Sequence, residues 1–242
     1  MDGVTLRAEM IAAMRDEAPA APAACLATVV VGDNPRCHAF ARDKRSAATE
    51  AGIATVAVDL AAATTQDELD RAIAALAADD AGVHGIFVQL PLPDHLHLSP
   101  IPPAQDVDGA HPGSLHAPTT PAAVLRLLDR YGIALDGRLV VVVGGRHPRL
   151  ADLLAARGAD VTVLAEPAPG TCRPADILVA AAGRPHTITA DHVGRGATVI
   201  DITGDLDLPA VATVAGAVAP YPLGVGPVAV ACLLRHTLDA AR

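Results

Sequence analysis

One residue stands out as a candidate for proton chemistry, because Lys44 is the only lysine in a chain with 17 arginines. Burial lowers the pKa of an ammonium group, whereas a guanidinium stays charged, so lysine is the basic side chain that can exchange a proton near neutral pH. The stretch 36–51 has helical spacing and is followed by Gly52, so Phe40 and Lys44, four residues apart, share one helix face. Taken alone, Lys44 would be interpreted as a solvated residue on the surface of the helix.

A second group of residues gives a weak signal for dinucleotide binding. The apolar stretch RLVVVV runs into Gly144 and Gly145, which allow a tight turn, and Arg146 follows in a position to face a phosphate. Pro148, however, stands where a dinucleotide loop needs small residues. The next apolar stretch ends at Glu166, and an acid there prefers a ribose hydroxyl and repels a 2′-phosphate, which favours NAD over NADP. The alternative interpretation is that Glu166 is a solvated acidic residue in a loop and binds no nucleotide.

Histidines and cysteines form no metal-binding pattern, and we predict no bound metal. His95 and His97 flank a loop without a third ligand at close spacing, and His111 is expected to be a loop residue too. The four cysteines are widely spaced and include no C-x-x-C pair, which indicates free thiols in a reducing compartment.

The elements that must position these residues alternate between strand and helix. In the first half, apolar runs followed by helical periodicity predict a β-α-β-α-β order with parallel strands. The expected elements are a helix at 4–17, a strand at 26–31, a helix at 36–51, a strand at 53–60, a helix at 66–79 and a strand at 84–93. The irregular stretch 99–121 is long for a connection in a compact domain, which indicates a functional loop or a linker.

The second half of the chain also alternates between strands and helices, with shorter elements. A helix is expected at 121–131, and from 138 onward strands that end in glycine or an acid alternate with short connections. This layout is typical of a Rossmann-type domain, in which ligands lie beyond the carboxyl ends of the strands. An apolar helix ends the chain.

Composition and charge exclude several classes. Hydrophobic residues make up 51% of the 242 residues, which is enough to build a core. The net charge of −9 argues against general nucleic-acid binding. No apolar run approaches the roughly 20 residues of a membrane span, and the first residues do not resemble a secretory signal, so a cytoplasmic protein is expected.

Four stretches resemble the bifunctional methylenetetrahydrofolate dehydrogenase/cyclohydrolase family in order and approximate spacing. They are VVVGDNPRCHAFARDKRSAATEAGI at 29–53, GIFVQLPLPDHL at 85–96, QDVDGAHPGSL at 105–115 and PYPLGVGPVAVACLLRHTLDAA at 220–241. Weaker matches lie between them, so the resemblance covers nearly the whole chain. VQLPLP and DVDG, together with the lysine helix, are its most specific parts.

The resemblance implies an α/β fold with an N-terminal three-layer α/β domain at 1–120 that binds folate, a Rossmann-type domain at 121–223, and a C-terminal helix, 224–242, that returns to the first domain. It also implies a homodimer. A tetrahydrofolate substrate would meet a nicotinamide cofactor, NAD or NADP, in this family.

The resemblance further implies roles for individual residues. Lys44 would activate the water that hydrolyses the methenyl bridge, Gln89 would hold Lys44 by a hydrogen bond, and Asp108 would bind the amino-pyrimidine edge of the pterin. Phe40 would stack on the pterin, and the loop that includes Pro222, Leu223, Gly224 and Val225 would border the folate.

The chain departs from the family pattern at several places, among them the acid at Glu166, the segment after VIDITG and the three places that follow. Phe40 stands where the family usually has a tyrosine, so one hydroxyl donor is missing. The loop at Gly144 and Gly145 is shorter by about three residues than the usual cofactor loop. Leu223 replaces a glycine, and its side chain would reshape the folate cleft.

Three functions follow from this comparison. The first is an enzyme that interconverts methylene-, methenyl- and formyl-tetrahydrofolate, with the cyclohydrolase half better supported than the dehydrogenase half. The second is a divergent paralogue that transfers a one-carbon unit in a specialised pathway without hydride transfer. The third is a non-catalytic folate-binding protein on the same fold. A plain Rossmann dehydrogenase would leave VQLPLP and DVDG unexplained.

Overall fold

The computed structural model describes residues 1–17, 23–145 and 147–242. These residues form two compact units, which are described separately. The lysine unit comprises residues 8–119 and 230–242, and the Rossmann unit comprises residues 1–7 and 120–229.

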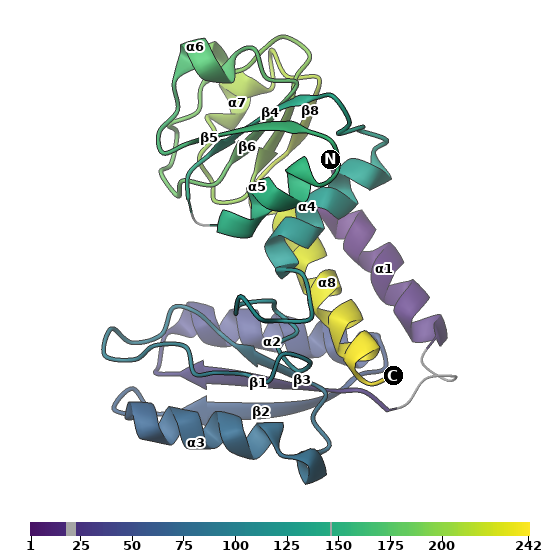
Figure 1. The fold of residues 1–242 in the computed structure, drawn as a ribbon, viewed down its shortest axis with the longest axis vertical. Coiled ribbons are helices and arrows are strands. Elements are labelled where there is room, and N and C mark those ends of the chain that lie inside the picture. Colours follow the sequence, from purple (N-terminus) through teal and green to yellow (C-terminus); the bar gives the residue numbers. More distant parts are fainter. Residues whose placement is uncertain (18–22, 146) are drawn as a thin grey trace. The chain divides into compact units, whose positions relative to one another are not determined.

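The lysine unit is built on a three-stranded parallel sheet with the order β2-β1-β3. Its strands are β1 (Cys25–Val31), β2 (Ala54–Leu60) and β3 (Gly85–Val88), and its helices include α2 (Pro35–Glu50), α3 (Gln66–Ala77) and the short η2 (Asp79–Ala81). Figure 1 shows α2 and α3 on opposite faces of this sheet, so the unit has the three layers that the sequence predicts.

The central strand β1 explains why both faces are covered. Its side chains alternate, so that Leu26 packs in one apolar cluster while Ala27 and Val29 pack in another with residues of α3. A strand that is buried on both faces needs apolar residues at consecutive positions, and the run LATVVV supplies them. The carboxyl ends of β1 and β3 therefore meet at one edge, where the next residues can form a site.

Local capping sets where the helices of this unit begin. The Asn34 side chain accepts a hydrogen bond from the Arg36 backbone at the start of α2, and Pro35 occupies the first turn. At the start of α3, Thr65 and Glu68 form a reciprocal capping box.

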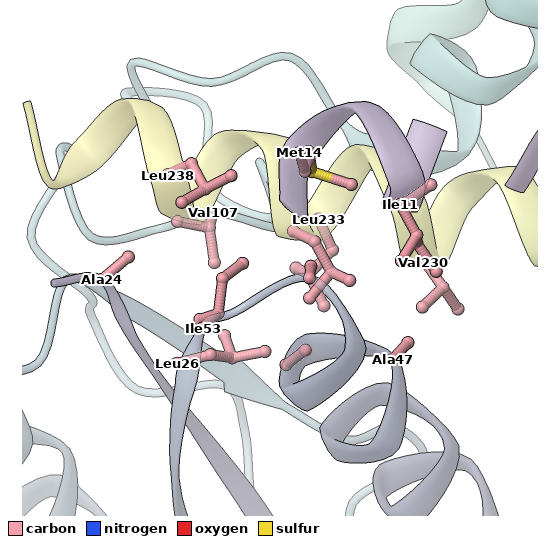
Figure 2. Packing of buried hydrophobic residues seen from close by; sticks show 14 of the residues in the cluster. Ile11, Met14, Ala24, Leu26, Ala47, Ile53, Val107, Val230, Leu233 and Leu238 are labelled. Atoms are coloured by element: carbon pink, nitrogen blue, oxygen red, sulfur yellow. The ribbon is translucent and has the colours of Figure 1, made fainter. Parts of the chain in front are cut away.

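Two further helices complete the core on the α2 face. Helix α1 (Gly3–Glu17) contributes Ile11 and Met14, and helix α8 (Val225–Ala240) contributes Val230, Leu233 and Leu238. Figure 2 shows these side chains pointing toward Leu26, Ala47 and Ile53. The apolar C-terminal helix is thus part of the core that supports β1 and α2.

The Rossmann unit contains a five-stranded parallel sheet with the order β5-β4-β6-β7-β8. The strands are β4 (Leu139–Val143), β5 (Asp160–Leu164), β6 (Ile177–Ala180), β7 (Thr198–Asp201) and β8 (Ala217–Ala219). The connecting helices are α4 (Thr119–Arg130), α5 (Pro148–Ala155), α6 (Pro169–Cys172), η3 (Ala190–His192) and α7 (Leu208–Val211). The parallel order confirms the predicted α/β class with a Rossmann-type sheet.

The ends of the predicted domains differ from the two observed units. Residues 1–7 and 224–229 belong to the Rossmann unit, although the sequence analysis assigned 1–120 and 224–242 to the first domain. The physical reason is local bonding: the Gly3 amide donates to the Leu223 carbonyl at 3.0 Å, and the Asp2 amide donates to the Tyr131 hydroxyl at 2.6 Å.

Within the described parts of the chain, no helix combines the length and the apolar character that a membrane crossing requires.

The core cluster gives a stability prediction. Leu233 is 1% exposed and Leu115 is 75% exposed. We expect Leu233→Ala to lower the free energy of unfolding by about 2–5 kcal/mol, because it leaves a cavity in the core, and Leu115→Ala to change it by less than about 0.5 kcal/mol. Urea unfolding of both variants tests this difference, and equal losses would contradict the assignment of α8 to the core.

Candidate active site

Lys44 lies on α2 with its amine directed at the end of β3. Nζ donates a hydrogen bond to Oε1 of Gln89 at 3.2 Å, and it lies 4.6 Å from the centre of the Phe87 ring and 5.8 Å from that of Phe40. The side chain is half-buried. Two aromatic faces within about 6 Å stabilise an ammonium group and shield it partly from water. The lysine is therefore held in a defined place.

Gln89 is fixed from three directions. Its backbone amide donates to the Val29 carbonyl at 2.8 Å, and its side-chain Nε2 donates to the Leu90 carbonyl at 2.6 Å. The residue is 8% exposed. Because Nε2 is committed to Leu90, Oε1 must point away from it, toward the Lys44 amine. The structure thus places Gln89 where it orients Lys44.

Asp108 belongs to the same electrostatic environment. Burial raises the pKa of its carboxyl group, while the Thr119 hydroxyl, which donates to Oδ1, and the charge of Lys44 oppose that rise. The nearby Asp106 carboxylate adds to the rise. Lys44, Gln89, Asp108 and Phe40 are therefore gathered around one region of the lysine unit.

The neighbouring acid, Asp106, has a structural role that the sequence analysis did not identify. It is fully buried and accepts hydrogen bonds from the amides of Ala110 and His111 at 3.1 and 2.9 Å. Gly109 follows with φ of 65°, and a Cβ there would come within 2.7 Å of the Ala117 carbonyl oxygen. The sequence signal at this place, an aspartate followed by a glycine, is Asp108-Gly109 and marks the turn, but nothing in it singles out Asp106 as the residue that accepts the loop amides.

The predicted cofactor residues lie after the first strands of the Rossmann unit. Gly144 follows β4 with φ of 104°, its amide donates to the Leu164 carbonyl at 2.7 Å, and a Cβ would lie 2.4 Å from the Ala181 backbone. Only glycine fits there. Gly145 is exposed and a Cβ on it would meet nothing. Arg146 lies outside the described residues.

Glu166 follows β5 and is already paired. Its Oε1 accepts a hydrogen bond from Nη1 of Arg184 at 2.7 Å, and both side chains are substantially exposed. Arg184 follows β6, so the pair bridges the carboxyl ends of strands on either side of β4. The sequence analysis singled out Glu166 but missed Arg184, because the two are 18 residues apart.

A buried acid supports the loop that carries Arg184. Asp205 is fully buried and accepts hydrogen bonds from the amides of Ala182 and Arg184 and from the Thr203 hydroxyl. These three hydrogen-bond donors offset the free-energy cost of burying the Asp205 carboxylate. Asp205 therefore fixes the backbone at the end of β6.

The loop Pro222–Val225 has its own support within the Rossmann unit. Leu223 is 56% exposed, whereas Val225 is 2% exposed. The Gly224 amide donates to the Pro220 carbonyl at 2.7 Å. A Cβ on Gly3 would collide with the Gly224 carbonyl, so the first turn of α1 packs directly against this loop.

No three His, Cys, Asp or Glu side chains of the described residues gather in the manner of a metal site. The prediction that no metal binds stays a prediction.

Comparison with known proteins gives a consistent result across the chain. Residues 1–108 match the catalytic domain of the tetrahydrofolate dehydrogenase/cyclohydrolase family, and residues 118–242 match the NAD(P)-binding domain of the same family. The bifunctional protein FolD 2 of Frankia alni is 42% identical over 247 residues, which cover 90% of this chain and 85% of that protein.

Solved structures that are similar in fold include members of the same family. The bifunctional FolD methylenetetrahydrofolate dehydrogenase/cyclohydrolase of Campylobacter jejuni is 33% identical, with a TM-score of 0.93 over 99% of this chain and 97% of that one. The corresponding Trypanosoma brucei protein, solved with NADP cofactor and an inhibitor, is 30% identical, with a TM-score of 0.94 over 99% and 96%.

The raised pKa of Asp108 predicts a pH-dependent stability difference. The unfolded chain ionises this carboxyl at a lower pH than the folded chain does, so stability is lost as the pH rises from the ordinary carboxyl pKa through the raised one. Asp108→Asn removes this loss while it keeps an oxygen for the Thr119 hydroxyl. We expect the variant to gain stability relative to the wild type at neutral pH and to gain less near about pH 4.

Urea unfolding at both pH values measures this difference, and the exposed Asp94→Asn variant provides the baseline for the loss of one negative charge. A gain for Asp108→Asn that is no larger at neutral pH than in acid would show that burial does not dominate at this carboxyl.

Proposed function

Because the chain belongs to the tetrahydrofolate dehydrogenase/cyclohydrolase family, we propose that it interconverts methylene-, methenyl- and formyl-tetrahydrofolate. The observation that carries the proposal is the amine of Lys44, held by Gln89 at 3.2 Å in the electrostatic field of Asp108. An enzyme of this kind needs a positioned base beside a group that binds the pterin, and Lys44 and Asp108 are our candidates for these two roles.

In the hydrolytic step, water attacks the carbon of the methenyl bridge, which carries positive charge delocalised over the two flanking nitrogens. The Lys44 side chain, in its neutral amine form, accepts a proton from that water as the new C–O bond forms. The bond from carbon to one nitrogen then breaks, and that nitrogen keeps the electron pair and takes up a proton. The hydroxyl group on the carbon loses its proton as the C=O double bond forms, and the resulting formyl group stays on the other nitrogen. One proton is released overall.

Asp108 and Phe40 hold the substrate for that step. An amino-pyrimidine edge presents two N–H donors, which a carboxylate can accept together, and the half-buried setting of Asp108 strengthens such bonds. Phe40 is 53% exposed, so its ring is available to stack on a flat pterin. Gln89 keeps Lys44 oriented and does not touch the reacting atoms.

The Rossmann unit is suited to a nicotinamide dinucleotide. Gly144 brings the backbone close to the end of β4, where a side chain would be excluded by Ala181, and the open space at Gly145 lets a ligand approach the backbone. Gly144 and Gly145 would hold the pyrophosphate, and a nicotinamide cofactor bound there would supply hydride transfer.

We propose NAD as the preferred nucleotide. Glu166 lies after β5, where an acid bonds to the ribose hydroxyls and repels a 2′-phosphate. Its pairing with Arg184 at 2.7 Å also occupies the guanidinium that could otherwise bind that phosphate. We further propose a cytoplasmic homodimer, in keeping with the family resemblance and with the free thiols of the four cysteines.

Substitution of the lysine tests the hydrolytic role. Lys44→Met removes the proton acceptor, and Lys44→Arg keeps the charge but cannot release a proton at neutral pH. We expect both variants to hydrolyse methenyl-tetrahydrofolate at least about 100-fold more slowly than the wild type. Arg42→Met, an exposed basic residue on the same helix, should keep the wild-type rate. Full activity of Lys44→Arg would assign the residue an electrostatic role only.

Substitution of Glu166 tests the nucleotide preference. In Glu166→Gln the repulsion of a 2′-phosphate is lost and Arg184 is released from its ion pair. We expect the ratio of KM for NADP to KM for NAD to fall by about fivefold, which corresponds to roughly 1 kcal/mol. Glu50→Gln, an exposed glutamate of α2, should leave the ratio unchanged.

Calorimetric titration of the wild type with both nucleotides accompanies this experiment. Binding of NAD supports the dehydrogenase half. Absence of binding by either nucleotide would overturn that half and favour the alternative of one-carbon transfer without hydride transfer.

A further inference from the structure

Two histidines bind the backbone of the segment that carries Asp108. Nδ1 of His236, on α8, lies 2.9 Å from the Val107 carbonyl oxygen, and Nε2 of His116 lies 3.0 Å from the Ala104 carbonyl oxygen. The two imidazole rings stack on each other, with centroids 4.9 Å apart and planes inclined by 25°. The segment from Ala104 to Asp108 is therefore held near both ends by one stacked pair.

The chemistry of these contacts fixes which ring atoms carry hydrogen. A carbonyl oxygen can only accept, so Nδ1 of His236 and Nε2 of His116 must both be donors. Each of the two contacts therefore needs a hydrogen on the named ring nitrogen.

The packing around Val107 restricts the positions that the backbone of residues 104–108 can take. Val107 is fully buried in the cluster that also contains Leu238 of α8, and Figure 2 shows the two side chains together. On the other side, a Cβ added to Gly85 of β3 would lie 2.9 Å from Thr237 Oγ1 and from both Val107 methyl groups. The Ile86 amide also donates to the Gln105 carbonyl at 2.8 Å. The segment is thus confined between β3 and α8.

The peptide bond links this arrangement to the site. The Val107 carbonyl belongs to the planar unit that contains the Asp108 amide nitrogen and ends at its Cα, so a bond to that oxygen restricts where the Asp108 side chain starts. Binding groups must be held within about 0.5 Å to work well. The Thr119 hydroxyl fixes the far end of the same side chain.

We propose that His236 is a positioning residue, which sets the place of the Asp108 carboxylate through the Val107 carbonyl, and that the stacked ring of His116 keeps His236 in that orientation. This inference rests on the proposed function, because Asp108 matters as the group that binds the pterin. His236 acts through the backbone and does not contact the substrate.

Two substitutions at one position separate the hydrogen bond from the packing. His236→Leu keeps apolar bulk without a donor. His236→Asn places an N–H donor on the atom attached to Cγ, as Nδ1 is in histidine, so it can restore the bond to the Val107 carbonyl. We expect His236→Leu to raise KM for methenyl-tetrahydrofolate about fivefold to tenfold, the effect of roughly one hydrogen bond, with kcat within about twofold. His236→Asn should recover most of the wild-type KM.

Hydrogen exchange provides a readout that does not depend on activity. The amides of Gly109, Ala110 and His111 all donate to Asp106, directly after the segment that His236 binds. We expect faster exchange of this peptide in His236→Leu and wild-type exchange in His236→Asn. His97→Leu, at an exposed loop position, is the matched control and should change neither exchange nor KM.

The outcomes distinguish this inference from the proposed function. Unchanged exchange and unchanged KM in His236→Leu, while Asp108→Asn raises KM, would overturn the inference and keep the function. Equal defects in His236→Leu and His236→Asn would also overturn it, since packing rather than the donor would then be responsible. A wild-type protein that neither binds nor hydrolyses the folate would overturn the proposed function and, with it, the link from His236 to substrate.

Discussion

The hydrogen bond from the Lys44 amine to the Gln89 side chain is the interaction on which the proposed chemistry depends. An amine on a four-carbon stem samples many positions unless another group holds it, and a proton acceptor is useful only at one of them. Gln89 can hold it because its own amide nitrogen is committed to the Leu90 carbonyl at 2.6 Å. That commitment depends on where β3 ends, which the pairing of β3 with β1 determines.

The two aspartates of QDVDG show how the same side chain serves two purposes. Asp106 accepts hydrogen bonds from the amides that follow it. These backbone donors compensate its buried charge, and the same bonds stabilise the fold of the loop. Asp108 accepts from the Thr119 hydroxyl and shares the region with Lys44, and burial raises its pKa. The carboxyl group whose pKa burial raises is thus the one that we propose to bind the ligand, and perturbed pKa values of this kind are typical of functional sites.

Some of this could be predicted from the sequence and some could not. The helix with Phe40 and Lys44 follows from spacing, and the parallel strands follow from apolar runs that alternate with helices. The match of Gln89 and Asp108 to Lys44 came from family resemblance, because contacts over 45 residues between α2 and the end of β3 leave no local pattern. The helix α4 begins at Thr119, two residues before the start at 121 that the sequence predicts.

Other contacts had no signal in a single sequence. The stacked His116 and His236 are brought together by the return of the C-terminal helix, and Arg184 meets Glu166 only because the sheet order places their strands on either side of β4. The assignment of residues 1–7 to the Rossmann unit depends on backbone hydrogen bonds, such as the one between Gly3 and Leu223, that any sequence could make.

The solitary lysine has a practical consequence. A reagent that acylates primary amines would find one side-chain target in the whole protein, and it would lie at the candidate site between Gln89 and the ring of Phe87. Biosynthetic incorporation of nitrogen-15 lysine would likewise give a single side-chain resonance in a magnetic resonance spectrum. That one signal would report occupancy of the site without assignment of the remaining spectrum.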